Sequence, residues 1–421
     1  MNQDETIALF EQGKEAWNVW ANNMLAEKKQ LEAEGRWEKE RYNLEENSWH
    51  IKSLINLNFD EIPDDSRIFS RTNFIGYIFP NLIYFSGTIP ININFVEANF
   101  FGGASFNCQF QGGANFHNAI FHDVTVFGNS IFKDDEDEYK NQTVSFWNTE
   151  FKQHVSFHKV QFERETYFDE AMFRGEVNFS RTVFQRDCDF QNANFKGNAR
   201  FNDTRFQQNV SFRGIKAEKI FYLERAQFRN IPDFRQASFQ GTPDLDQLVI
   251  TPPAVSDPSL PSKYRALRRM AEQGKNHVLE QQMLAGEIKA ERQLGCLKPT
   301  DWLISYLYQG LSNFGLSITQ PILLWLANII FFAIAYIQVA IKNNRCDIVD
   351  TAWQLSLKRS FILPNINVDK EKMNNMLQCL GYDKTNSIAG MFFAEGVLQI
   401  GLSALFIFMF FHALRLRFRV G

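Results

Sequence analysis

A large apolar residue recurs through the middle of the chain at intervals that alternate between five and six residues. From position 146 onward this residue is almost always phenylalanine, and the residues between the repeated positions are mostly polar. A fixed short period predicts a solenoid, in which each unit buries its apolar face only against its neighbours. The predicted solenoid core consists of Phe146, Phe151, Phe157, Phe162, Phe168, Phe173, Phe179, Phe184, Phe190, Phe195, Phe201, Phe206 and Phe212.

A small or β-branched residue stands two positions before each of these phenylalanines, as Val155 stands before Phe157. In an extended segment, residues i and i−2 point to the same side. One large and one small inward residue on each short side is therefore the predicted packing unit. The intervening polar residues, such as Lys152, Arg164 and Arg186, are expected to face water.

Four sides with this spacing close one coil of about 22 residues, and the chain holds enough of them for about seven or eight coils. Two irregularities interrupt the repeat. The step from Phe106 to Phe110 is one residue short, and residues 133–141 form an acidic insertion that we expect to protrude. Glycines are expected at corners that need positive φ, at Gly102, Gly103, Gly112, Gly113, Gly175 and Gly197.

The repeated units read "ANF", "VNF" and "VSF", and over residues 59–240 the chain resembles the phenylalanine-centred branch of the pentapeptide-repeat family. The resemblance implies a right-handed quadrilateral parallel β-helix, which we expect over residues 56–242. It implies no single activity, because such solenoids serve several unrelated roles.

Residues 1–55 are predicted to be helical and to cap the solenoid. The segment from Gly13 to Trp20 resembles the "G…WN.W" helix that often precedes pentapeptide repeats. An open first coil presents unpaired backbone groups, so an amphipathic helix carrying Trp17 and Trp20 would cover it.

The repeat is expected to end at residue 242, followed by a proline-rich linker over 243–262 and a helical-hairpin connector over 263–317. The connector resembles the hairpin that joins repeats to membrane segments in a membrane-bound group of pentapeptide-repeat proteins. The basic tail, residues 415–421, resembles the end of the same group.

Two long apolar runs, residues 318–341 and 388–414, are long enough to cross a bilayer as helices. The loop between them, residues 342–387, contains an amphipathic segment from Thr351 to Pro364. This segment stands where a two-span channel has its pore helix. It lacks a Gly-Tyr-Gly type of filter and carries Lys358 and Arg359, so we favour a helix at headgroup level.

Two spans place both ends of the chain on one side of the membrane, and the arginines of the tail favour the cytoplasmic side. The predicted location is the inner membrane of a bacterium, with the solenoid and both termini in the cytoplasm. Cys346 and Cys379 would then lie in the extracytoplasmic loop, where they are candidates for a disulfide.

Three polar residues of the second run, Glu395, Gln399 and Ser403, recur every four positions and therefore share one helix face. Polar residues inside a span usually face away from lipid. They are candidate pore-lining residues of a homo-oligomer, since two helices are too few to enclose a pore. In the alternative, Gln399 bonds a neighbouring helix and the spans are only an anchor.

Charge, cysteine spacing and motif content limit the classes of function that we expect. The net charge is −4, and residues 95–240 carry 19 acidic against 17 basic side chains, so neither nucleic-acid binding nor imitation of DNA is indicated. The five cysteines form no metal-binding spacing, and we find no catalytic motif. The sequence predicts a non-enzymatic protein without cofactor or metal, whose rod binds an unidentified cytosolic protein.

Overall fold

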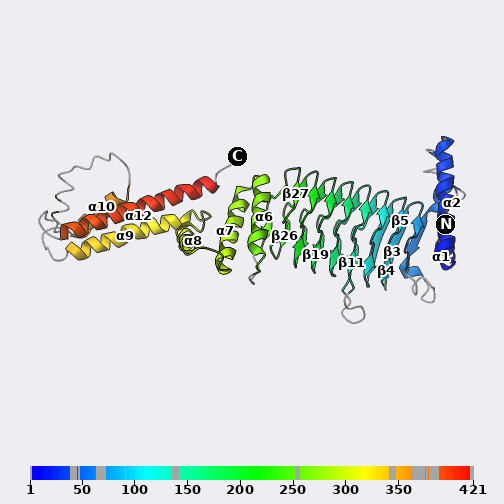
Figure 1. The fold of residues 1–421 in the computed structure, drawn as a ribbon, viewed down its shortest axis with the longest axis horizontal. Helices are drawn as coiled ribbons and strands as arrows, with labels where there is room; N and C mark the ends of the chain where they lie inside the picture. The colour runs from blue at the N-terminus through cyan, green and yellow to red at the C-terminus, as the bar shows by residue number, and fades with distance from the viewer. Residues whose placement is uncertain are drawn as a thin grey trace. The chain divides into compact units, whose positions relative to one another are not determined.

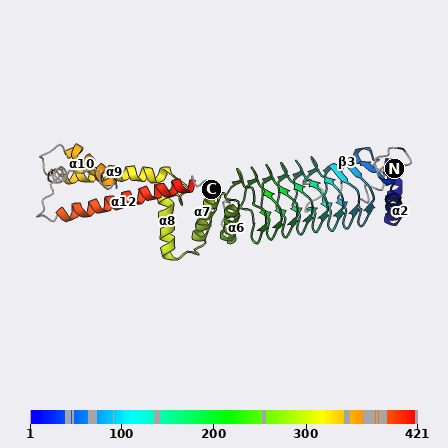
Figure 2. The same cartoon turned by 90° about the horizontal axis from the view of Figure 1, so that it is seen from above.

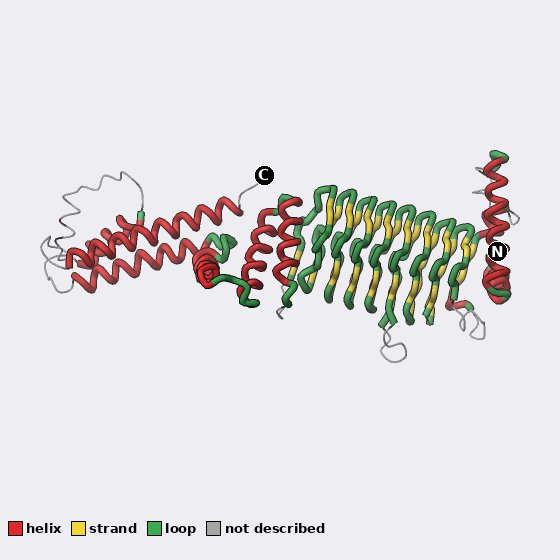
Figure 3. Tube along the Cα trace, viewed as in Figure 1, coloured by secondary structure: helices red, strands yellow, loops and turns green. Residues whose placement is uncertain are grey.

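The structure is a computed structural model that describes residues 2–37, 45, 48–62, 73–90, 92–134, 142–251, 257–340, 348–361, 375, 378 and 388–417. The chain divides into two compact units, Met1–Asn276 and His277–Gly421. Within the described residues, every strand belongs to the first unit, and the second unit is built from helices (Figures 1 and 3).

The first unit is a four-sided parallel β-solenoid of about eight turns, as the sequence predicts. Short strands alternate with corners along the whole rod (Figure 3). One face contains β4 (Ile93–Asn94), β7 (Ala114–Asn115), β11 (Val144–Ser145), β15 (Thr166–Tyr167), β19 (Cys188–Asp189) and β23 (Val210–Ser211). The next face contains β2 (Ile78–Phe79), β5 (Asn99–Phe100), β8 (Ile120–Phe121), β12 (Glu150–Phe151), β16 (Met172–Phe173), β20 (Asn194–Phe195), β24 (Lys216–Ala217) and β27 (Ser238–Phe239).

The other two faces join into one sheet of 14 strands, to which β1 (Ile55–Asn58) also belongs. The third face contains β9 (Thr125–Val126), β13 (Val155–Ser156), β17 (Val177–Asn178), β21 (Ala199–Arg200) and β25 (Phe221–Tyr222). The fourth contains β10 (Ile131–Phe132), β14 (Gln161–Phe162), β18 (Val183–Phe184), β22 (Arg205–Phe206), β26 (Gln227–Phe228) and β28 (Val249–Ile250). These faces meet in β3 (Ile83–Ile89) and β6 (Ala104–Phe110), which are seven residues long. The short step between Phe106 and Phe110 therefore removes a corner, so two sides run on as one strand.

Strand register confirms the predicted period. Phe151 pairs with Phe173, which is 22 residues further along the chain. Across the acidic insertion, Phe121 pairs with Phe151, a step of 30 residues. The insertion therefore lengthens one coil without changing which phenylalanines pair.

The predicted phenylalanines form the core, and each is at most 2% exposed. Rings from successive coils stack face to face, as in Phe146 and Phe168, whose centroids are 4.8 Å apart. Rings from different faces meet edge to face, as in Phe146 and Phe157 at 5.3 Å and 81°. The small residue two positions earlier, such as Val155, is also buried and fills the space between the rings.

Helices cover both ends of the solenoid. At the first coil lie α1 (Gln3–Glu11), α2 (Lys14–Ala33) and the short α4 (Trp49–Ser53). Trp17 of α2 is fully buried, and its Nε1 donates a hydrogen bond to the carbonyl oxygen of Ile78 at 2.8 Å. The Asn18 side chain bonds backbone groups of Gly76 and Ile78 at 3.0 Å, so α2 satisfies the open edge of the first coil.

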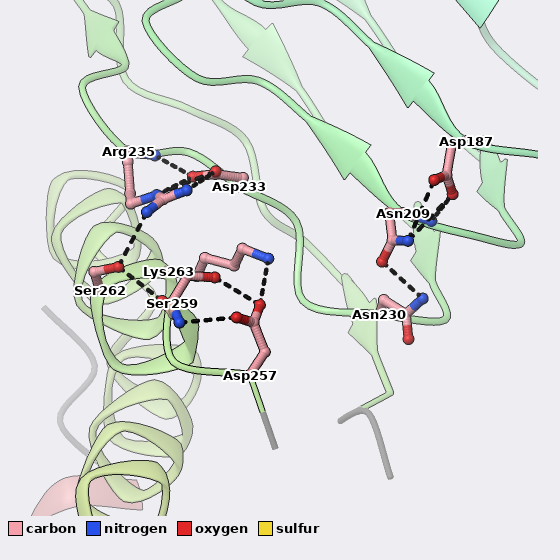
Figure 4. Close-up of polar contacts among 9 residues, drawn as sticks. All are labelled: Asp187, Asn209, Asn230, Asp233, Arg235, Asp257, Ser259, Ser262 and Lys263. Carbon is pink, nitrogen blue, oxygen red and sulfur yellow. Dashed lines mark hydrogen bonds and ion pairs between the residues drawn. The ribbon is translucent and has the colours of Figure 1, made fainter. Parts of the chain in front are cut away.

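At the other end, α6 (Leu260–Gln273) covers the last coil, and Gln273 Nε2 donates to the carbonyl oxygen of Phe239 at 2.8 Å. Arg235 links Asp233 of the rod to Ser262 of α6, while Asp257 bonds Ser259 and Lys263 (Figure 4). The solenoid continues beyond the predicted end at residue 242, because β28 still pairs with β26. Leu245 and Ile250 replace phenylalanine in this last coil, which hides it from a pattern based on phenylalanine.

Two expectations about corner residues are wrong. None of the six predicted glycines has positive φ; the left-handed corner positions hold residues such as Asn118, Glu170 and Arg225. Glycine is needed for close approach instead, because a Cβ on Gly197 would lie 2.3 Å from a backbone oxygen of the preceding coil. Arg164 does not face water: its side chain is 2% exposed.

The second unit contains α7 (His277–Gln293), α8 (Pro299–Ser312), α9 (Thr319–Ala340), α10 (Ile348–Ser360) and α12 (Ile388–Arg417). Two stretches, Thr319–Gln338 of α9 and Glu395–Arg415 of α12, are long and apolar enough to cross a membrane. These helices lie side by side, and α8 runs across their direction (Figures 1 and 2).

Candidate functional site

The candidate pore residues Gln399 and Ser403 lie on the inner face of α12 and are fully buried. The Oε1 atom of Gln399 accepts a hydrogen bond from Tyr336 Oη of α9 at 2.5 Å. Its Nε2 atom lies within hydrogen-bond distance of Ser356 Oγ at 2.8 Å and Ser360 Oγ at 2.9 Å, both on α10. One amide thus joins all three helices.

Ser403, one turn further along α12, accepts a hydrogen bond at 2.9 Å from Nδ2 of Asn328 on α9. We use "polar seam" for this buried set, whose members are Asn328, Tyr336, Ser356, Ser360, Gln399 and Ser403. Small hydroxyl side chains allow helices to approach closely, and bonds between polar side chains hold helices together inside a membrane.

The seam arises from matching helical spacings. Gln399 and Ser403 are four residues apart on α12, and Ser356 and Ser360 are four apart on α10. Residues at this spacing lie on one face of a helix. The spacing on α12 was readable from the sequence, whereas its partners on the other helices were not, because nothing in a single sequence aligns three helices in depth.

Glu395 lies at one end of the seam and is half-buried. Its Oε2 atom is enclosed and has no hydrogen-bond partner among the described residues. Arg359 of α10 lies close by: a Cβ on Gly396 would stand 2.8 Å from its guanidinium carbon. The Nη1 atom of Arg359 donates to Tyr336 Oη at 2.8 Å. The three predicted residues therefore share one face, with the ionisable one at an end.

The remaining predicted site, the pair Cys346 and Cys379, lies outside the described residues. Among the residues that the structure does describe, no group of three or more His, Cys, Asp or Glu side chains could hold a metal ion.

The rod carries a surface hollow that the sequence did not reveal. Its volume is about 370 Å³, and Trp147 on its rim is 48% exposed. The lining residues are Thr143, Ser145, Trp147, Tyr167, Asp169, Glu170, Gln191 and Asn192. Positions 147, 169 and 191 recur every 22 residues, so an aromatic and a carboxylate come together only once coils are stacked.

Burial, together with the negative charges of Asp189 and Glu170, raises the pKa of Asp169 to about 6. Tyr167 Oη donates to Glu165 Oε2 at 2.8 Å beside it. An exposed indole beside carboxylates is an arrangement suited to a cationic group, since cations are attracted by both.

Comparison with known proteins gives one match, and it lies in the rod. Residues 168–216 match the family model described as pentapeptide repeats (9 copies). No curated protein and no solved structure matches the chain. The stretch that matches lies within the stacked coils from β15 to β24, so these coils of the rod are similar to pentapeptide repeats.

Proposed function

We propose that this protein is a membrane-anchored interaction protein without catalytic activity. In this proposal the rod presents a binding surface to a cytosolic protein, and the second unit holds the rod at the bilayer. The helical connector and basic tail, which resemble a membrane-bound group of pentapeptide-repeat proteins, agree with this arrangement.

The observation that carries the proposal is the separation of polar and apolar groups in the second unit. The polar seam is turned inward, while large apolar side chains of α9 and α12 face outward, including Leu323, Phe331 and Phe408 at 64% to 66% exposure. A bundle that is polar inside and apolar outside is stable in lipid and would aggregate in water.

Helix α8 extends this apolar surface. Its exposed side chains include Trp302, Leu303, Ile304, Tyr306 and Leu307, at 46% to 60% exposure. Tryptophan and tyrosine favour the boundary between lipid and water. Because α8 runs across the direction of the two spans (Figure 2), it suits a position in the plane of the membrane surface.

A second candidate function is a pore formed by several copies. The Oε2 atom of Glu395, enclosed and without a hydrogen-bond partner in the described part of the chain, favours it, because a carboxylate near an oligomer axis could attract cations. The hydrogen bonds of Gln399 and Ser403 favour the anchor, because both side chains already have partners within one chain.

Reconstitution tests both proposals. We expect the protein to remain in the membrane fraction after alkaline extraction, and protease added to the cytoplasmic side to reach the rod. Ion flux is then measured in liposomes for wild type and Glu395→Gln. Extraction into the soluble fraction would refute anchoring. Cation flux that Glu395→Gln lowers would replace the anchor by the pore.

A further inference from the structure

Helix α10 lies along α9 and reaches far down its length. Ser356 Oγ donates to the carbonyl oxygen of Ile329 at 2.7 Å, and Trp325 Nε1 donates to the carbonyl oxygen of Ser360 at 3.2 Å. Ile329 stands near the middle of the apolar stretch Thr319–Gln338. At 1.5 Å per residue, that middle is about 15 Å from either end. The order of these contacts makes α10 antiparallel to α9 and carries its end past the middle.

One exposed stripe of α10 is apolar along the length of the helix. We use "α10 stripe" for Val349, Trp353 and Leu357, which are 54%, 36% and 42% exposed. They stand four residues apart and so share one face, whereas Ala352, Leu355, Ser356 and Ser360 are fully buried against the bundle. Asp350, Gln354 and Lys358 line the adjacent face, so the depth of α10 is inferred from its contacts with α9.

Two polar groups near the end of α10 are arranged as burial in lipid requires. The carbonyl of Ser360 at the helix end accepts the indole N–H of Trp325, which matters because backbone groups without partners are costly in hydrocarbon. Arg359 extends to Tyr336, seven residues along α9 from Ile329 and toward the end of the span. Long basic side chains on membrane helices reach toward the headgroups in this way.

We propose that α10 is a re-entrant membrane helix, with bilayer hydrocarbon covering the α10 stripe. This inference rests on the proposed function as a membrane anchor. Lipid is the occupant because α9 presents Phe331, 66% exposed, at nearly the depth where Ser356 meets Ile329. The second unit then has three membrane elements, and α10 shields the polar seam from lipid.

Spin labels at single cysteines test this arrangement in the full-length protein. The background carries Ser at Cys296, Cys346 and Cys379, and cysteines are introduced singly as Val349→Cys, Trp353→Cys and Leu357→Cys. The protein is reconstituted into vesicles of phosphatidylethanolamine and phosphatidylglycerol. Collision rates with oxygen and with a water-soluble nickel chelate give the depth of each label. Phe331→Cys serves as the control within the span.

A re-entrant helix predicts a steady gradient: position 357 should lie about 12 Å deeper than position 349, near the depth of the control. Equal, shallow depths at all three positions would overturn the proposal and leave α10 at the headgroups. If labels at 353 and 357 were shielded from both oxygen and the nickel chelate, and their spectra were broadened by spins in other copies, a second chain would cover the α10 stripe. That result would exclude lipid as the occupant. A control label exposed to the nickel chelate would instead refute the anchor itself.

Discussion

Phe221 fills the space that Ala217 leaves in a column of stacked phenylalanines. Ala217 pairs with Phe195 in the coil before it and with Phe239 in the coil after it. The ring of Phe221 lies 5.6 Å from that of Phe195 and 5.5 Å from that of Phe239. Elsewhere the order of sizes is reversed, as in Phe195 followed by Ala199. The coil therefore keeps its core volume by exchanging a large and a small residue between neighbouring sides.

This exchange predicts strong coupling between the two positions. Ala217→Phe alone should destabilise the rod by about 1–3 kcal/mol through overpacking, and Phe221→Ala alone by about 3–5 kcal/mol through a cavity. The double variant restores the usual order of sizes, so its loss should be smaller than the sum by more than about 1 kcal/mol. Chemical denaturation followed by circular dichroism measures all three. Additive losses would show that the two side chains do not share one space.

The sequence predicted the rod because its core residues recur at a fixed spacing that needs no knowledge of distant contacts. It did not predict the compensation between Ala217 and Phe221, since that depends on the position of rings in adjacent coils. The last coil was missed because Leu245 and Ile250 are apolar without being phenylalanine. The role of Gly197 was misjudged, because close approach between coils, unlike a turn, leaves no local signal.

The candidate site shows the same limit. One helix face with Glu395, Gln399 and Ser403 followed from their spacing. What this face of α12 contacts depends on the position of α10. That position depends on hydrogen bonds between helices far apart in the sequence, such as the bond between Gln399 and Ser356. The sequence favoured a headgroup position for α10, and the contacts with α9 and α12 favour a deeper one.

Arg164 is predicted to be the main stabilising residue at the base of the acidic insertion. Its guanidinium donates to the carbonyl oxygens of Lys133, of Gln142 at 3.3 Å and of Gln111 at 3.0 Å. Arg164→Ala would leave these part-buried acceptors without a charged donor, so the rod should lose about 2–4 kcal/mol. Arg186→Ala is the matched control: this exposed residue pairs with Asp134, and its loss should cost less than about 1 kcal/mol. Equal melting temperatures for the two variants would contradict the assignment.

Asp169 should make the stability of the rod depend on pH in a defined direction. Its pKa rises from 3.8 to about 6 through burial and neighbouring carboxylates, so the folded protein binds this proton more tightly than the unfolded chain. The resulting stabilisation is present below pH 3.8 and is lost as the pH rises through about 6. Asp169→Asn should therefore melt like wild type near pH 4 and be more stable by about 1 kcal/mol at pH 7.

A carboxylate whose pKa is lowered, Asp203, provides the control for this pH series. A hydrogen bond from Arg225 lowers the pKa of Asp203, and Arg225 Nε lies 2.7 Å from its Oδ1. Asp203→Asn should reduce stability at pH 7, since the paired carboxylate contributes above its ordinary pKa and loses its contribution in acid. Thermal melting of both variants from pH 4 to pH 7 distinguishes the two signs. A gain at pH 7 for both would indicate a general effect of charge.

Gln399 should hold the three helices of the second unit together if the polar seam is structural. Gln399→Leu leaves Tyr336, Ser356 and Ser360 without the amide that joins them, and should destabilise the unit by about 1–3 kcal/mol. Leu398→Ala, at an outward position that is 57% exposed, should change stability by less than about 0.5 kcal/mol. Unfolding in mixed detergent micelles gives these values. Because the rod is a separate unit, its melting should be unchanged in both variants. If Gln399 instead faced an aqueous pore, the leucine would be tolerated in micelles and would lower ion flux in liposomes. Loss of flux without loss of stability would therefore contradict the structural role and support the pore.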